Sequence, residues 1–440
     1  MTDISIGFML IAALFILVLI GMRIAVALMV VAFVGVWIIR DNFDLAMKLM
    51  SIATYNGVAN YLFATIPLFV LMGHLVSISN VGKDTFDVAE ALLRKVLGGL
   101  GVATVAANAI FAAVTGVSIA SAAVFTKVAV PEMTRHGYKP SFAAGTVAGS
   151  SVLGMLIPPS LLLIIYGVLA EVSIGRMFIA GLIPGALLAL GFVMVIVGSA
   201  RFAPSFVFTK ETLAKQAAPP VPQVLMGKAE MMRKLTPIIL LVIFVLGGLY
   251  SGFFTPTEAG GVGAFAALVI AVLRKSLNLQ KIWAVMTQTG SISVGILVLL
   301  VAAGFYGQML AVAGIPSAIG DLVRGSGFGA YGFLFIYVIL VLVLGMILDS
   351  TSILLILVPI AAPIAQGLDF DLIHFGIISV IAVEVGLLTP PFGISIFTVH
   401  ATLSDKDTTL ESIFGGALPY VGVMVGVMVL IAAFPWLIMS

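Results

Sequence analysis

Long apolar runs, separated by short polar segments, occupy most of this 440-residue chain. A membrane-spanning helix needs about 20 predominantly apolar residues. Runs compatible with single spans cover residues 4–20, 22–39, 61–78, 142–169, 177–199, 236–252, 257–273, 285–312, 373–399 and 415–438. Two further runs, 98–130 and 329–365, are too long for one span and are interrupted by small polar residues. They predict either pairs of spans or re-entrant helical hairpins, so the pattern favours an all-α polytopic membrane protein.

The composition excludes several other classes of protein. Hydrophobic residues make up 62% of the chain and charged residues 9%, whereas an average soluble domain has roughly 25% charged residues. That scarcity of charge excludes a soluble globular protein, a disordered chain and a nucleic-acid-binding protein. The chain contains no cysteine, so disulfides and thiolate nucleophiles are absent. Residues 1–20 lack a basic segment and a cleavage site, and we interpret them as the first span.

The cationic residues predict an orientation in the membrane. If each long run enters and leaves on the same side, all 21 Lys and Arg residues except Arg40, Lys48, Arg176 and Arg324 fall on one side. Cytoplasmic loops carry such an excess of positive charge. Both termini are therefore expected on the opposite, periplasmic side.

The two halves of the chain resemble each other at an offset of about 232–235 residues. Gly154-Met-Leu-Ile-Pro-Pro-Ser160 aligns with Gly386-Leu-Leu-Thr-Pro-Pro-Phe392, and residues 73–87 align with residues 307–321. This predicts a first repeat at 1–200 with its hairpin at about 98–130, a cytoplasmic linker at 201–235, and a second repeat at 236–440 with its hairpin at about 329–365. Five full spans in each half is an odd number, so the second repeat is expected to be inverted in the membrane, as in many secondary transporters.

Two Pro-Pro pairs interrupt spans at equivalent positions of the two halves. Pro158-Pro159 and Pro390-Pro391 remove backbone donors and free backbone carbonyls. Hydroxyl residues surround them, namely Ser150, Ser151, Ser160, Thr389 and Ser395. Such oxygens suit a small hard cation, as in the discontinuous helices of transporters. The alternative is that the prolines only kink the helices for packing.

Polar clusters also mark the expected hairpin tips. They are Thr115-Gly-Val-Ser118 in the first and Asp349-Ser-Thr-Ser352 in the second. Their hydroxyls either complete an ion shell or bond back to their own helices. Amphipathic stretches, such as residues 81–96, precede both hairpins and are either interfacial helices or ordinary connectors.

Few ionisable residues are expected at depth. They are Asp349, Glu384 and the span-end residue Glu258. Asp349 and Glu384 each either bind a cation, carry a proton or cap a broken helix. The histidines have no metal-binding spacing, and we interpret them as structural.

Several longer motifs resemble the large membrane subunit of tripartite ATP-independent periplasmic (TRAP) transporters across nearly the whole chain. They are Phe111-Ala-Ala-Val-Thr-Gly-Val-Ser118, Pro131-Glu-Met-Thr-Arg-His-Gly-Tyr138, Leu153-Gly-Met-Leu-Ile-Pro-Pro-Ser160, Phe254-Thr-Pro-Thr-Glu-Ala259 and Glu384-Val-Gly-Leu-Leu-Thr-Pro-Pro-Phe-Gly393. The resemblance implies sodium-driven import of a small organic acid, such as a C4-dicarboxylate, across the bacterial inner membrane. It also implies an elevator-like motion of a transport domain against a scaffold.

The resemblance further implies partners but no enzyme activity and no cofactor beyond Na⁺ as the coupling ion. A periplasmic binding protein delivers the substrate, and a small four-helix membrane subunit braces the large one. We expect that subunit to be a separate polypeptide, because the first span follows Met1 almost directly. The remaining contacts are with membrane lipid, and no nucleic acid is involved.

The resemblance also places the sites. The first sodium site is expected at Thr115, Gly116, Ser118, Gly154 and Pro158. The second is expected at Gly345, Asp349, Ser350, Gly386, Thr389 and Pro390. The organic anion is expected between the tips, at Ser118, Ser150, Ser350 and Thr351. The family's first tip often carries two adjacent hydroxyl residues, and here Val117 occupies one of those places.

Other functions stay open at this level. A self-sufficient divalent-anion symporter with sodium coupling shares the hairpin architecture. An intramembrane aspartyl protease needs two facing carboxylates, for which Asp349 and Glu384 are the obvious pair. A passive channel is the third alternative.

Overall fold

The computed structural model describes residues 2–93, 95–214, 226–325, 327, 329–403, 405 and 407–438. These residues form helices and no strand, apart from an isolated bridge between Tyr138 and Phe208. Among them, seven helical segments are long and apolar enough to cross a membrane, and five shorter apolar helices accompany these. The prediction of an all-α polytopic membrane protein is therefore confirmed.

In the described part of the first half, the chain forms twelve α-helices. They are α1 (Asp3–Leu19), α2 (Ile24–Arg40), α3 (Phe43–Ala59), α4 (Thr65–Ile78), α5 (Val81–Leu93), α6 (Gly99–Thr115), α7 (Ser118–Arg135), α8 (Pro140–Ser151), α9 (Leu161–Leu169), α10 (Ile174–Phe202), α11 (Pro204–Val207) and α12 (Lys210–Ala214). The 3₁₀ turns η1 (Tyr61–Ala64) and η2 (Val152–Met155) precede α4 and follow α8. The sequence pattern missed α3, whose polar residues Asp44, Lys48 and Asn56 interrupt its apolar stretch.

The described part of the second half forms ten α-helices. It contains α13 (Lys228–Val242), α14 (Gly248–Tyr250), α15 (Pro256–Leu273), α16 (Leu279–Val312), α17 (Ile315–Gly325), α18 (Gly329–Gly345), α19 (Ser350–Gly367), α20 (Leu372–Leu387), α21 (Ile394–Thr402) and α22 (Leu410–Ala433). A π-helical turn, η3 (Ile243–Gly247), joins α13 to α14, and the 3₁₀ turn η4 (Pro435–Leu437) follows α22.

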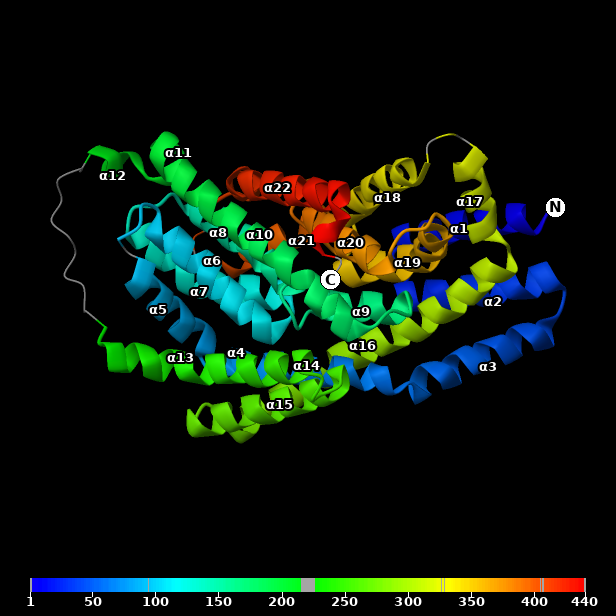
Figure 1. Cartoon of the computed structure of the whole chain (residues 1–440), viewed down its shortest axis with the longest axis horizontal. Helices are drawn as coiled ribbons and strands as arrows, with labels where there is room; N and C mark the ends of the chain where they lie inside the picture. The colour runs from blue at the N-terminus through cyan, green and yellow to red at the C-terminus, as the bar shows by residue number, and fades with distance from the viewer. Residues whose placement is uncertain are drawn as a thin grey trace.

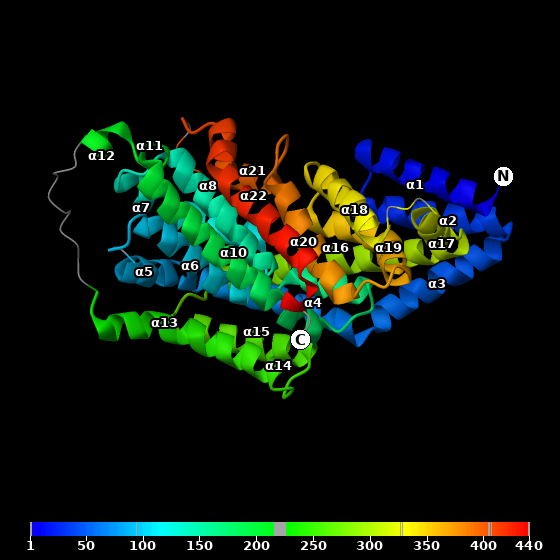
Figure 2. The same cartoon turned by 45° about the horizontal axis from the view of Figure 1, so that its top comes forward.

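Helices of the two halves exchange contacts in matching pairs. Helix α2 packs against α16, and α15 packs against α4. Likewise α8 contacts α22 while α20 contacts α10, and α7 contacts α21 while α19 contacts α9. Figure 1 shows α1, α2 and α3 with α16 and α17 at one end of the elongated molecule and α5, α6, α7 and α13 at the other. The turned view in Figure 2 shows α8, α10, α22 and α20 running side by side between those ends.

Each of the two long runs folds into a pair of helices joined by a short tip. In the first, Gly116 and Val117 separate α6 from α7, and in the second, residues 346–349 separate α18 from α19. Gly116 adopts a left-handed conformation (φ 63°) that ends α6 and turns the chain.

The prolines also act as the sequence indicates. Helix α8 stops at Ser151 and α9 begins at Leu161, while α20 stops at Leu387 and α21 begins at Ile394. We name residues 156–160 the first break and residues 388–393 the second break. Both Pro-Pro peptide bonds are cis.

The start of the predicted linker is more ordered than a plain linker. The backbone N–H of Lys139 donates to Val207 at 2.8 Å, and that of Thr209 donates to Gly137 at 2.9 Å. Residues 207–209 are thus fixed to the turn between α7 and α8. The segment Ala217–Pro222 lies outside the described residues.

Candidate functional site: two hairpin tips and two helix breaks

The first tip rests directly on the first break. The backbone N–H of Leu161 donates to the carbonyl of Gly116 at 3.1 Å. A Cβ placed on Gly116 would lie 2.5 Å from the carbonyl oxygen of Pro159, so only glycine fits there. A Cβ on Gly154 would lie 3.4 Å from the backbone nitrogen of Ser118. The structure therefore brings the tip residues of the expected first site beside Gly154 and the Pro-Pro pair.

The hydroxyls of this first region are largely engaged within their own helices. Thr115 donates to the carbonyl of Phe111 at 3.1 Å, which is the back-bonding alternative. Ser160 caps α9 and donates to the carbonyl of Met155 at 2.5 Å. Ser151 donates to the carbonyl of Ala148 at 2.8 Å. Backbone carbonyls and Ser118 thus remain the better-placed oxygen ligands.

The second tip crosses the second half's broken helix at a pair of glycines. A Cβ on Gly345 would lie 2.8 Å from the Cα of Gly386, and the reverse distance is 2.7 Å. Asp349 is the N-cap of α19, where it accepts the backbone N–H of Ser352 at 3.1 Å and also its hydroxyl. The structure therefore favours the capping role for Asp349. Thr389 donates to the carbonyl of Val385 at 2.6 Å.

Glu384 lies between the two tips. Its side chain is fully buried (0% exposed), and Ser350 of the second tip donates to its Oε1 at 3.2 Å. Ser118 of the first tip lies near the same carboxyl group. Oε2 has no hydrogen-bond partner among the described residues. The residue types alone could not show that one carboxylate meets both hairpins.

Ser150 belongs to a buried network away from the second tip. The side-chain amide of Asn108 donates to Ser150 at 2.6 Å, and Ser121 donates to Asn108 at 2.5 Å. Ser150 in turn donates to the carbonyl of Thr146 at 2.6 Å. This network ties α6, α7 and α8 together. The sequence reasoning missed Asn108, although an amide inside an apolar run is itself a signal.

The other expected residues are placed as follows. Thr351 is half-buried beside Ser350, and Pro390 is exposed. Ser395 is buried at the start of α21, and its hydroxyl has no partner among the described residues. Glu258 is an exposed capping-box residue of α15, paired with Thr255. His374 bonds the carbonyl of Ile431 at 3.0 Å, which agrees with a structural role.

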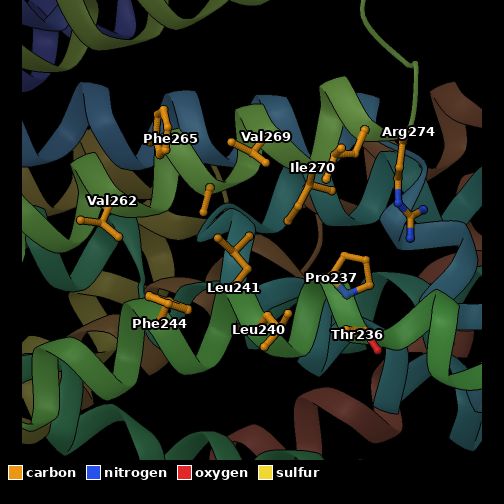
Figure 3. A pocket seen from close by; sticks show the side chains of 12 residues that line it. Thr236, Pro237, Leu240, Leu241, Phe244, Val262, Phe265, Val269, Ile270 and Arg274 are labelled. Atoms are coloured by element: carbon orange, nitrogen blue, oxygen red, sulfur yellow. The ribbon is translucent and has the colours of Figure 1, made fainter.

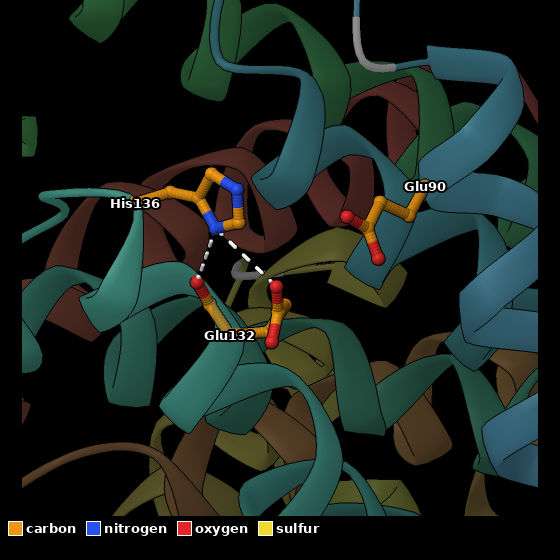
Figure 4. Close-up of side chains that lie close together, drawn as sticks. All are labelled: Glu90, Glu132 and His136. Atoms are coloured by element: carbon orange, nitrogen blue, oxygen red, sulfur yellow. Dashed lines mark hydrogen bonds and ion pairs between the residues drawn. The ribbon is translucent and has the colours of Figure 1, made fainter. Parts of the chain in front are cut away.

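Potential metal ligands gather at a second place, where α5 meets α7. Figure 4 shows Glu132 of α7 and His136, four residues later at the C-cap of this helix, with Glu90 of α5 beside them. Their ligand atoms lie within 4.8 Å of one another. His136 Nδ1 already contacts the carbonyl oxygen of Glu132 at 2.9 Å. Glu132 is 14 residues from Ser118 along α7, about 21 Å at 1.5 Å per residue, so this group is separate from the tips.

An apolar groove of about 540 Å³ runs between α13 and α15. Figure 3 shows Leu240 of α13 and Phe244 of η3 facing Phe265 and Val269 of α15, with Arg274 at one end. Phe244 is 58% exposed and Phe265 68% exposed. Such an apolar surface suits contact with lipid and has few polar groups that could bind a small carboxylate.

Comparisons with known proteins agree with this architecture. The family model for the DctM component of the tripartite ATP-independent periplasmic transporter matches residues 11–437. The C4-dicarboxylate TRAP transporter large permease protein DctM of Pseudomonas aeruginosa is 32% identical over 392 residues, which cover 89% of this chain and 88% of that protein. The sialic acid TRAP transporter large permease protein SiaM of Vibrio cholerae is 29% identical, with 86% of each chain covered.

A solved structure shares the fold at low sequence identity. The YdaH transporter of Alcanivorax borkumensis superposes with a TM-score of 0.58 at 16% identity and covers 88% of this chain and 89% of its own. That likeness concerns the fold alone. The family match over residues 11–437 and the 32% identity to a curated relative show that this chain belongs to the DctM component, or large permease, of the TRAP transporter family.

Proposed function

We propose that this chain carries a small organic acid into the bacterial cell, driven by the sodium gradient. Two relatives are named for C4-dicarboxylates and sialic acid, which are both small carboxylates. The meeting of both hairpin tips around one buried centre is the observation that carries the proposal, because a transported anion and its coupling ions need a shared, enclosed site. Membership of a transporter family favours transport over the protease alternative.

Each of the two proposed coupling sites combines residues of one hairpin tip with residues at the helix break beside it. The first uses Gly116 and Ser118 with Gly154 and Pro158, and the second uses Gly345, Ser350, Gly386 and Thr389. Backbone carbonyls supply most ligands, since the free hydroxyls are few. The anion binds between the tips through hydroxyls and helix N-termini, which attract negative charge.

The proposed motion is an elevator in which a transport domain slides against a scaffold. The matched contacts of α2 with α16 and of α15 with α4 support a scaffold built from both halves. The exchanged contacts of α7 with α21 and of α9 with α19 support a transport domain built from two inverted repeats. Helices α5 and α17 connect the two parts in sequence, and we name them the arm helices.

Large permeases of this family work with a small membrane subunit and a periplasmic binding protein, and we propose both as partners here. The test is reconstitution of this chain in proteoliposomes, alone and with its cognate partners. We expect accumulation of the carboxylate only with both partners present and an inward sodium gradient. Uptake by this chain alone, unaffected by a binding protein, would favour the self-sufficient symporter.

The proposed orientation places both termini in the periplasm. The chain has no cysteine, so single cysteines report sidedness without background. With a membrane-impermeant maleimide added to intact spheroplasts, we expect labelling of Asp41→Cys and none of Lys281→Cys until the membrane is permeabilised. The reverse pattern would overturn the orientation.

A further inference from the structure

Glu384 is a buried carboxylate that belongs to neither of the two expected sodium sites. It lies on α20, two residues before Gly386, and is 0% exposed. Ser350 donates to its Oε1 at 3.2 Å, and Ser118 approaches the same carboxyl from the other hairpin. The second oxygen, Oε2, has no hydrogen-bond partner among the described residues. A buried acceptor left in this way is costly unless something further binds to it.

No cationic side chain in the described part of the chain compensates Glu384. The ion pairs among the described residues involve other carboxylates. Helices α18 and α19, which pack against α20, carry no Lys, Arg or His. On α10, Arg176 and Arg201 are exposed and so cannot contact a fully buried group. On the remaining elements that pack against α20, the titratable groups are Tyr166 of α9, His400 of α21, and Glu411 and Tyr420 of α22.

The other titratable groups nearby do not change this balance. His374, on α20 itself, is ten residues away, about 15 Å along the helix, and it bonds Ile431. Tyr337 of α18 donates to Ser379 at 3.0 Å. Asp349, at the second tip, is a further carboxylate and adds negative charge. On α7, Lys127 is nine residues from Ser118, about 13 Å along the helix.

We propose that Glu384 is the charged ligand of a third coupling-cation site, in which one Na⁺ is held by its carboxylate and the hydroxyls of Ser118 and Ser350. The inference rests on the proposed sodium-coupled function and extends it. Carboxylate and hydroxyl oxygens are the ligands that hard cations take. Because the two hydroxyls come from different hairpins, the site is complete only while both tips meet α20.

The proposed cation site would explain how a negatively charged substrate binds beside Glu384. A bare carboxylate between the tips repels an incoming organic anion, and that repulsion is strong where little water screens it. A bound Na⁺ cancels the charge of Glu384 and lets the anion approach. Cation and substrate therefore favour each other's binding, which is the coupling that a symporter needs.

The test compares Glu384→Gln with wild type in proteoliposomes that contain the cognate partners. It measures ²²Na⁺ and labelled substrate uptake together, and the dependence of the rate on sodium concentration. We expect Glu384→Gln to carry one Na⁺ fewer per substrate, to show a less steep sodium dependence and to accumulate less substrate. Glu384→Asp, which keeps the charge but shortens the side chain, is expected to keep the ratio with a several-fold weaker sodium affinity. The exposed residue Glu411 gives the matched control, Glu411→Gln, which is expected to behave as wild type.

An unchanged sodium-to-substrate ratio and steepness in Glu384→Gln would overturn the third site. If Glu384→Gln does not fold, Glu384→Asp decides the question, because Glu384 belongs to neither of the other two sites and a shortened ligand must raise the sodium concentration for half-maximal uptake. An unchanged value in Glu384→Asp would then overturn the site. If wild type itself shows no sodium-driven uptake, the proposed function fails and not only this inference.

Discussion

The two tip-and-break pairs share a plan but differ in how they meet the surface. In the first pair, Pro158 and Pro159 are buried, and the tip is bonded to the break through Gly116 and Leu161. In the second pair, Pro390 and Pro391 are exposed, and Phe392 is 54% exposed. The first pair is sealed, and the second is open to the surface in this conformation.

The helices that follow the two breaks explain this difference. Helix α9, after the first break, packs against α4 and α16 as well as α19 and α20. Helix α21, after the second break, packs chiefly against α7, α8 and α22. The helix after the first break therefore contacts α4 and α16, which are not among the main neighbours of the helix after the second break. In the elevator motion proposed above, this difference in exposure would mark one end state of the cycle.

The largest expected effect comes from adding a side chain at Gly116 in the first tip. Gly116→Ala combines a left-handed backbone with a Cβ 2.5 Å from the Pro159 carbonyl. We expect the free energy of unfolding to fall by about 2–4 kcal/mol and uptake to be lost. Thermal unfolding in detergent and proteoliposome uptake measure the two effects.

Gly314→Ala provides the matched control, because Gly314 has φ 70° and a Cβ added there would have no neighbour within 4 Å. It carries only the backbone cost, about 1–2 kcal/mol. Equal losses in the two variants would show that contact with the first break adds nothing.

The second tip is expected to tolerate substitution somewhat better. Gly345→Ala places a Cβ 2.8 Å from the Cα of Gly386 within helical backbone that any residue adopts. Overpacking of this kind costs about 1–3 kcal/mol, and separation of the tip from α20 should reduce uptake. Gly304→Ala, at a helical glycine of α16 with no such neighbour, is expected to be neutral or stabilising in the same thermal assay. A greater loss for Gly345→Ala than for Gly116→Ala would reverse the comparison.

The two arm helices, α5 and α17, also differ in how deeply their ion pairs are buried. Arg274, at the C-cap of α15, pairs with Asp84 of α5, and Lys234 of α13 bonds Asp87 at 2.6 Å, with these side chains mostly buried. Arg324 of α17 pairs with Asp321 at 3.1 Å, but those side chains are 57% and 74% exposed. We expect Arg274→Ala to cost about 1–3 kcal/mol and Arg324→Ala about 0.2–1 kcal/mol. Thermal unfolding checks the order, and equal costs would contradict the stronger anchoring of α5.

The smallest effects are expected at single hydroxyls. Ser118→Ala should raise the sodium concentration for half-maximal uptake about two- to tenfold, as loss of one polar contact of roughly 0.5–1.5 kcal/mol does. Thr389→Ala should raise it less, because its hydroxyl already donates to Val385. Sodium titration of uptake measures both. A wild-type response in Ser118→Ala, or a larger change in Thr389→Ala, would contradict the assignment.

Much of the architecture was predictable because its causes are local. Apolar runs made the helices, and the small polar residues at 115–118 and 349–352 marked the tips. The Pro-Pro pairs ended α8 and α20 where the sequence indicated, since proline removes a donor wherever it stands. The missed helix α3 and the docked segment 207–209 depend instead on neighbours, because tertiary packing there stabilises polar or short stretches.

The order of residues is enough to place this protein in lipid and to locate its helix breaks and hairpin turns. These follow from solvation of the side chains and from the backbone chemistry of proline and glycine. The capping contacts of Asp349 with Ser352 and of Glu258 with Thr255 are equally local, because each joins residues three positions apart. Which distant groups meet was settled by the packing of the helices, which engaged Ser150 with Asn108 and placed Glu384 between Ser118 and Ser350. Those contacts join residues up to 266 positions apart, and a long-range meeting depends on how helices pack, which no local pattern encodes.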